Sequence, residues 1–158
     1  MNKVCPFCNQ KVIQKQKYFE SDYFVVLVDS RPITYAHSLI VPKRHVKRFS
    51  QLNQEEATDL LKIINALTEK LLPKLSCTGY NLLSNNGASA GQTVNHVHFH
   101  FIPRKEGDRS QDFKNLCFPA EKDRPSLTKA QLQKRTSRLS KELELEVNKQ
   151  HGEFKSEK

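Results

Sequence analysis

Residues 94–102 read VNHVHFHFI, and this alternating stretch organises the interpretation of the whole sequence. Successive side chains of an extended strand point to opposite faces, so His96, His98 and His100 share one face. The intervening positions are apolar apart from Asn95. We therefore expect a half-buried antiparallel strand whose apolar side packs on a core and whose other side presents three imidazoles.

Two kinds of chemistry suit three imidazoles on one face of a strand. Same-face neighbours lie about 7 Å apart, so several can act on one phosphate. An unperturbed histidine has a pKa near 6.5, which leaves much of it neutral and nucleophilic at pH 7. His-x-His on a strand is also good zinc geometry. The alternation alone favours neither interpretation over the other.

Other segments predict an α+β fold. Residues 18–28 end in a β-branched and aromatic run, which indicates a strand that stops near Asp29, and residues 37–41 form the next strand after a hairpin connection. Residues 79–84 form a short strand and residues 85–91 a loop of small residues. The expected architecture is an antiparallel sheet of about five strands, with one main helix on its apolar face and a C-terminal helix.

The main helix has clear end signals. Asn53 followed by Glu56 is typical of a capping box. Pro73 is expected to close the helix. Five residues in between recur at helical spacing: Leu60, Leu61, Ile64, Leu67 and Leu71.

The C-terminal part is expected to be a charged helical extension. We divide the chain into a domain of residues 1–120 and an extension of residues 121–158, whose end, 148–158, is expected to be disordered. The extension turns helical from Ser126. Its narrow apolar stripe suits packing on a partner surface and consists of Leu132, Leu139, Leu143 and Val147.

Composition limits the class of protein. The 158 residues fit one domain that buries a core without disulfides. The net charge of +9 is spread along the chain and suits a small nucleotide or nucleic acid alike. No apolar run approaches the roughly 20 residues of a membrane span, so no membrane association is expected. The N-terminus lacks an apolar signal region, so we expect no export and a cytoplasmic location.

Two clusters allow more than one interpretation. Cys5 and Cys8 have the spacing of half a zinc site, although a redox pair or two buried structural cysteines are alternatives. Four cations lie between residues 43 and 48. They are either a solvated loop or a group that steers polyphosphate toward the site.

The residues around the three histidines resemble the histidine-triad (HIT) family. His96, His98 and His100, followed by two apolar residues, match its His-φ-His-φ-His-φ-φ signature, with φ apolar. The flanking stretches 91–94 (GQTV) and 103–108 (PRKEGD) look closest to the fragile-histidine-triad branch, which cleaves diadenosine polyphosphates. The resemblance covers roughly residues 3–110.

The resemblance implies a role for each residue. His98 is the nucleophile, His100 contacts phosphate, and His96 completes the catalytic triad. Asp29 binds the ribose hydroxyls and His37 closes the phosphate end. The implied substrate-binding residues are Asp29, His37, Asn85, Gln92 and Thr93. That branch prefers glutamine where this chain has Asn85, a departure that concerns substrate choice.

The implied reaction has two half-reactions. His98 displaces the leaving group to form a nucleotidyl-histidine, and water then releases a nucleoside monophosphate. The first substrate expected is a diadenosine polyphosphate, and the second is a nucleoside phosphoramidate. No organic cofactor is implied.

The resemblance also implies a metal and an assembly. Bacterial members with the N-terminal cysteine pair hold a structural zinc, and the matching ligands here are Cys5, Cys8, His45 and His96. Related proteins form homodimers by pairing strands and the long helix, so we expect a dimer. Nucleotides are the expected partners, and nucleic acid is not expected.

Two further hypotheses belong to other classes. The chain could be a nucleotide-binding regulatory module with vestigial catalysis, its basic surface meeting a partner. Alternatively, it could be a zinc enzyme that uses all three triad histidines as metal ligands.

Overall fold

The computed structural model describes residues 5–108 and 124–150, with side chains described up to residue 143. The strands are β1 (Lys17–Glu20), β2 (Phe24–Val28), β3 (Ser38–Pro42), β4 (Gly79–Leu83) and β5 (Phe99–Arg104). The α-helices are α1 (Gln10–Gln16), α2 (Gln54–Ala66), α3 (Leu72–Lys74) and α4 (Lys129–Gln150).

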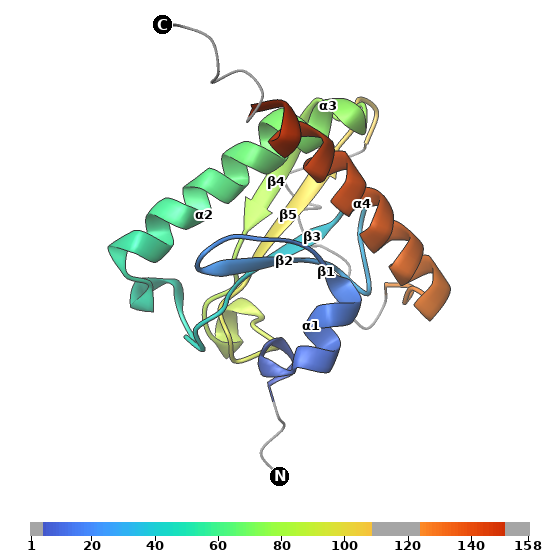
Figure 1. Cartoon of the computed structure of the whole chain (residues 1–158). Helices are drawn as coiled ribbons and strands as arrows, with labels where there is room; N and C mark the ends of the chain where they lie inside the picture. The colour runs from blue at the N-terminus through green and yellow to red at the C-terminus, as the bar shows by residue number, and fades with distance from the viewer. Residues whose placement is uncertain (1–4, 109–123, 151–158) are drawn as a thin grey trace, which may run out of the picture.

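The strands form one antiparallel sheet in the order β1-β2-β3-β5-β4 (Figure 1). The expected α+β architecture with about five strands is therefore confirmed. Residues 18–28 contain two strands where the sequence predicted one. The turn between β1 and β2 is held by Asp59 of α2, whose Oδ2 accepts from Ser21 Oγ at 2.6 Å and from the Tyr23 N–H at 3.0 Å.

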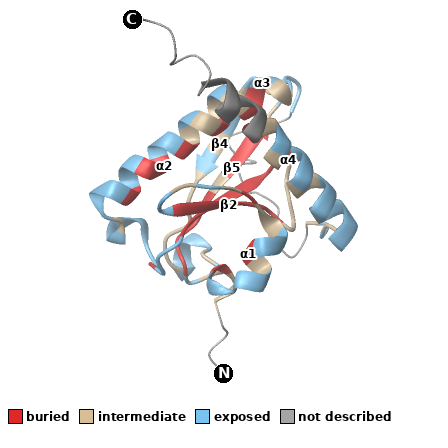
Figure 2. Cartoon of the chain, in the orientation of Figure 1, coloured by how far each residue is buried: buried red, intermediate tan, exposed pale blue. Residues whose placement is uncertain are grey.

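The regular part of the histidine strand is shorter than the alternation predicted. β5 begins at Phe99, so His96 and His98 precede the ladder; the chain bends at residues 94–96, where the His96 N–H donates to the Val94 carbonyl at 2.8 Å. The alternation of faces nevertheless holds, because Val97, Phe99 and Phe101 are all buried in the main core. Figure 2 shows the buried residues concentrated in β2 and β5.

Each face of the sheet has its own apolar cluster. The larger cluster includes Phe24, Ile40 and Phe101, which pack against residues of α2, α3 and α4. The smaller cluster is covered by Phe7 and by Ile13 of α1. The sequence did not predict α1, whose seven residues carry little periodic signal.

The capping box of α2 is confirmed. Asn53 Oδ1 accepts from the Glu56 N–H at 2.8 Å, and Glu56 Oε2 accepts from the Asn53 N–H at 2.9 Å. The prediction that Pro73 closes the helix was wrong, because Pro73 lies within α3. A wider π-type turn, Leu67–Leu71, precedes α3 and lets the backbone tolerate a residue that has no N–H.

The apolar stripe of α4 packs on the sheet of its own chain. Leu139 and Leu143 are buried in the main core, and Leu132 packs against it. The expectation that this stripe meets a partner surface was wrong for these three residues, because the sheet face between α2 and α4 needs covering. The side chain of Val147 lies outside the described residues.

The predicted boundary between the domain and its extension lies outside the residues that the structure describes. The boundary at 120/121 and the tail 151–158 lie outside the described residues. The backbone of α4 remains helical through Gln150, three residues into the segment expected to be disordered. Within the described residues, no helix is both long and apolar enough to cross a membrane.

Candidate active site

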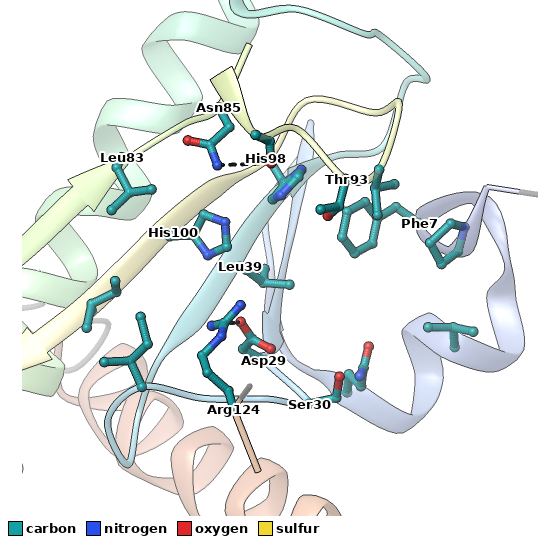
Figure 3. A pocket seen from close by; sticks show the side chains of 17 residues that line it. Phe7, Asp29, Ser30, Leu39, Leu83, Asn85, Thr93, His98, His100 and Arg124 are labelled. Carbon is teal, nitrogen blue, oxygen red and sulfur yellow. Dashed lines mark hydrogen bonds and ion pairs between the residues drawn. The ribbon is translucent and has the colours of Figure 1, made fainter. Parts of the chain in front are cut away.

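His98 lies on the pocket side of the sheet with its ring orientation set by the backbone. Its Nδ1 lies 2.9 Å from the carbonyl oxygen of His96, which can only accept a hydrogen bond. Nδ1 therefore carries the proton, and the lone pair of the neutral ring is on Nε2. His98 is 5% exposed and lines the pocket shown in Figure 3. This tautomer is the one that a nitrogen nucleophile requires.

His37 and His100 form a pair in which His100 lines the pocket and His37 is buried behind it. Nε2 of His37 lies 2.9 Å from Nδ1 of His100, and the Ile33 N–H donates to Nδ1 of His37 at 3.1 Å. His37 therefore donates from Nε2, and His100 keeps its own proton on Nε2. Burial is the main cause that lowers the pKa of both histidines to about 3. The positive charge of Arg124 adds to this effect for His37, and the His37 ring adds to it for His100, so both are neutral at pH 7.

Asp29 lies at the other end of the pocket. Its Oδ1 accepts from the Arg31 N–H at 2.7 Å, which fixes the carboxylate. Its Oδ2 lies 3.5 Å from Nη1 of Arg124 and 3.4 Å from Nδ1 of His37. Because His37 is neutral and accepts at that nitrogen, Arg124 supplies the positive charge that Asp29 faces.

The pocket has room for a nucleotide. Its volume is about 530 Å³, which falls within the range of small-molecule sites. Figure 3 shows Asn85 and Thr93 beside His98, with Asp29 and Arg124 at the opposite end. The apolar part of the lining consists of Pro6, Phe7, Val12, Ile33, Leu39, Leu83, Val94 and Ile102.

The predicted substrate residues fall into two groups. Asp29, Asn85 and Thr93 line the pocket together with His98 and His100. His37 lies behind His100, where it positions that ring.

Gln92 does not line the pocket and instead supports a neighbouring loop. Its Oε1 accepts from the Gly87 N–H at 2.7 Å, and its Nε2 donates to the Lys47 carbonyl at 2.9 Å. Gly87 has φ +101°, a conformation that favours glycine. Gln92 thus holds the 85–91 loop that carries Asn85.

The four predicted zinc ligands converge at one point. The ligand atoms of Cys5, Cys8, His45 and His96 all lie within 4.8 Å of one another. Nδ1 of His96 is 3.5 Å from Sγ of Cys5, and Nδ1 of His45 is 3.2 Å from Sγ of Cys8. A tetrahedral zinc places neighbouring nitrogen and sulfur ligands roughly 3.3–3.8 Å apart, so this donor set fits the metal.

The orientation of His96 supports the same assignment. Its Nε2 lies 2.9 Å from the Pro42 carbonyl and must donate there, so the lone pair on Nδ1 faces the cysteines. In the described part of the chain, the candidate metal group that contains His96 includes neither His98 nor His100. The geometry therefore does not favour the hypothesis of a zinc enzyme that uses all three triad histidines.

Two important pocket residues were not identified from the sequence. Phe7, inside the cysteine pair, contacts the His98 ring at a centroid distance of 5.2 Å. Arg124 reaches the pocket from beyond the histidine strand. Neither has a local sequence signal, because each is placed only by tertiary contacts. Phe24 and Val26, candidates for holding the base, are buried in the main core, and Phe19 packs against it.

The cations between residues 43 and 48 are partly committed to structure. Arg44 donates from Nε and Nη2 to the Glu56 carboxylate at 2.9 and 2.7 Å. This pair lowers the pKa of Glu56 and anchors the start of α2. Arg44 is therefore a structural residue, and none of the four cations lines the pocket.

Comparison with known proteins identifies the family. The HIT domain family model matches residues 10–107, well over half of the chain. The chain belongs to the HIT domain family. The resemblance inferred from the triad is confirmed, and the match includes all three triad histidines.

Three curated relatives show the breadth of this family. An uncharacterized HIT-like protein of Methanocaldococcus jannaschii is 42% identical over 66% of this chain and 82% of its own length. Adenosine 5'-monophosphoramidase of Candida albicans is 37% identical over 65% of this chain and 71% of its length. Bis(5'-adenosyl)-triphosphatase of Dictyostelium discoideum is 32% identical over 86% of this chain and 91% of its own length. The expectation of a histidine-triad hydrolase is confirmed at this level.

Solved structures share the fold. A hypothetical histidine triad nucleotide-binding protein of Sulfolobus tokodaii is 25% identical, with a TM-score of 0.74 over 97% of this chain and all of its own. A zinc-bound histidine triad family protein of Mycobacterium smegmatis is 23% identical, with a TM-score of 0.70 over 92% of this chain and 96% of its own.

Proposed function

We propose that this HIT protein hydrolyses a nucleotide derivative at its α-phosphorus through a nucleotidyl intermediate on His98. The observation that carries the proposal is the 2.9 Å contact between Nδ1 of His98 and the His96 carbonyl. It orients the ring and leaves the nucleophilic lone pair on Nε2, within a pocket of nucleotide size. The same contact stabilises the positive charge that the ring acquires when Nε2 attacks phosphorus.

The first step forms a bond between Nε2 of His98 and phosphorus, while the leaving group departs with its electron pair. His100 carries a proton on Nε2 and donates to an oxygen of the phosphoryl group. Water then attacks the same phosphorus and loses a proton to solvent, and the phosphorus–nitrogen bond breaks. This step releases a nucleoside monophosphate and returns His98 to its neutral form with the lone pair on Nε2. Two displacements with a good nucleophile replace one poor displacement by water.

A dinucleoside polyphosphate is the first substrate that we propose, and a nucleoside phosphoramidate is the second. The names of the triphosphatase and phosphoramidase relatives support both classes. Asn85 lines the pocket beside His98, where it meets the leaving group. Its amide donates to the Gly91 carbonyl at 3.3 Å.

The decisive experiment incubates the protein with diadenosine tetraphosphate and, separately, with an adenosine phosphoramidate. We expect release of AMP from at least one, and no release by His98→Asn. Mass spectrometry of a quenched wild-type reaction should locate a nucleotidyl adduct on His98. Cys77→Ser, a change remote from the pocket, should retain turnover. Nucleotide binding without turnover would support the regulatory-module hypothesis instead.

We further propose that zinc is a structural element held by Cys5, Cys8, His45 and His96. The support is the convergence of two thiols and two imidazole Nδ1 atoms within 4.8 Å. The metal would link the N-terminal segment to the histidine strand and fix His96, whose carbonyl orients His98. No step of the reaction passes through it. The thiols would be reduced, consistent with the cytoplasmic location that we propose.

We also propose a homodimer built on β4. This strand lies at one edge of the sheet and exposes Tyr80 and Leu82. An edge strand with large apolar side chains is suited to pairing with a second copy. Leu61 of α2 is 58% exposed and would extend the interface. Light scattering should give twice the chain mass, and Leu82→Lys should shift it toward the monomer.

A further inference from the structure

Arg124 is a largely buried, charged residue that lines the pocket although it lies outside the part of the chain that the family model matches. Its side chain is 10% exposed, and the matched part is residues 10–107. The family resemblance places Asp29 on the ribose hydroxyls; we propose that Arg124 acts beside it as a second contact to this vicinal diol and makes the site selective for ribonucleotides. This inference rests on the proposed nucleotide hydrolase function and identifies a specificity-determining residue for it.

The charges at this end of the pocket support the pair. Asp29 is 5% exposed, and a buried carboxylate requires a compensating charge. His37 does not supply it, because its Nδ1 already accepts the Ile33 N–H. Arg124, with Nη1 at 3.5 Å from Oδ2 of Asp29, is the cation that faces the carboxylate.

The pair retains hydrogen-bonding capacity. The 3.5 Å separation is at the outer limit of a hydrogen bond. Nε of Arg124 is buried and has no hydrogen-bond partner among the residues that the structure describes. A buried N–H without a partner is costly, so this donor points to a ligand that completes it.

A ribose diol has the complementary chemistry. Each hydroxyl donates one hydrogen and accepts at its oxygen. Asp29 accepts the hydroxyl hydrogens, and Arg124 donates to a hydroxyl oxygen. The two charged groups thus satisfy both capacities of the diol, which a carboxylate alone does not do. Figure 3 shows the guanidinium beside the Asp29 carboxylate, at the end of the pocket away from Asn85.

The segment that carries Arg124 is anchored to the loop that carries Asp29. The Leu127 N–H donates to the Ser30 carbonyl at 2.8 Å. Further along, Arg135 of α4 donates to the Tyr35 carbonyl at 2.9 Å, and its guanidinium lies 4.7 Å from the centre of the Tyr35 ring. Two contacts therefore place the extension on the loop 29–37 and keep Arg124 in the pocket.

The test is calorimetric binding of two probes, AMP and 2′,3′-dideoxy-AMP, which lacks the diol. Arg124→Ala should weaken AMP binding by about ten- to hundredfold, the range of one hydrogen bond to a charged group. It should weaken binding of the dideoxy probe much less. Arg124→Lys keeps the charge but not the fork of donors, so it should show an intermediate loss of selectivity.

The matched control is Arg138→Ala, which removes the same charge from the extension at a residue that is 57% exposed and outside this pocket. It should bind both probes as the wild type does. Equal losses for AMP and the dideoxy probe in Arg124→Ala and Arg124→Lys would overturn the assignment. If the wild type binds neither probe, the proposed function itself fails. If the wild type binds AMP and the Arg124 variants retain full selectivity, only this inference fails.

Discussion

His37 donates a 2.9 Å hydrogen bond from Nε2 to Nδ1 of His100, and the Ile33 N–H determines the direction of that bond. Because Nδ1 of His100 accepts this bond, the neutral ring must carry its proton on the other nitrogen, Nε2. A residue that lies behind the pocket wall thus determines that His100 presents a hydrogen-bond donor at Nε2.

Replacing His37 should lower turnover without removing a group from the pocket lining. His37→Ala leaves His100 without a partner that sets its tautomer and orientation. We expect kcat to fall on the order of a hundredfold, the scale of a displaced catalytic group, with a smaller change in KM. His37→Gln keeps an N–H donor and should fall less. Equal kcat values for wild type and His37→Ala would show that His100 needs no such partner.

Mild acid should destabilise the protein through its buried histidines. Burial lowers the pKa of His37 to about 3, whereas the unfolded chain has a value near 6.5. Between these values the unfolded state binds more protons, so the stability falls as pH decreases. Each such histidine contributes a slope of about 1.4 kcal/mol per pH unit. Urea unfolding at pH 7 and pH 5 should show the loss, and His37→Gln should show a smaller one.

Removing one cysteine of the zinc site should release the metal and loosen the N-terminal segment. Elemental analysis of wild-type protein should give about one zinc per chain. Cys5→Ser should reduce this content and lower Tm by roughly 5 °C or more. Cys77→Ser, which lies outside the candidate ligand group, is the control and should keep the metal. A wild type that carries no zinc would contradict the assignment.

Truncating the buried stripe of α4 should destabilise the whole fold. Leu139 is fully buried in the main core, so Leu139→Ala is expected to lower the free energy of unfolding by about 2–5 kcal/mol. Leu61→Ala, at a residue that is 58% exposed, should change it by about 0.5 kcal/mol or less. Chemical denaturation measures both. A small effect at Leu139 would mean that α4 is dispensable for stability.

Gln92 offers a test of loop support. Its two hydrogen bonds join Gly87 to Lys47 across the 85–91 loop. Gln92→Ala should weaken nucleotide binding by about tenfold through loss of loop order, with Tm changed only slightly. Gln92→Glu keeps the acceptor for the Gly87 N–H but loses the donor, so its effect should be intermediate. Unchanged binding by Gln92→Ala would mean that the glycines alone set the loop.

Several features followed from the sequence because their causes are local. The alternation of residues 97–102 separated the buried Val97, Phe99 and Phe101 from His98 and His100, since side chains of an extended backbone point alternately to its two faces. Asn53 and Glu56 marked the start of α2 because a capping box spans only four residues. The HIT signature, confined to residues 96–102, similarly identified the family.

The tertiary structure decided what depends on contacts between distant residues. Ile33 sets the proton on His37, Pro42 aims His96 at the cysteines, and Arg124 meets Asp29 across 95 positions of sequence. Leu139 packs on the chain's own sheet, although its spacing suited a partner equally well. The sequence by itself determined which side chains could do the chemistry. Their tautomers, charges and neighbours were decided only when folding brought remote backbone groups within hydrogen-bonding distance.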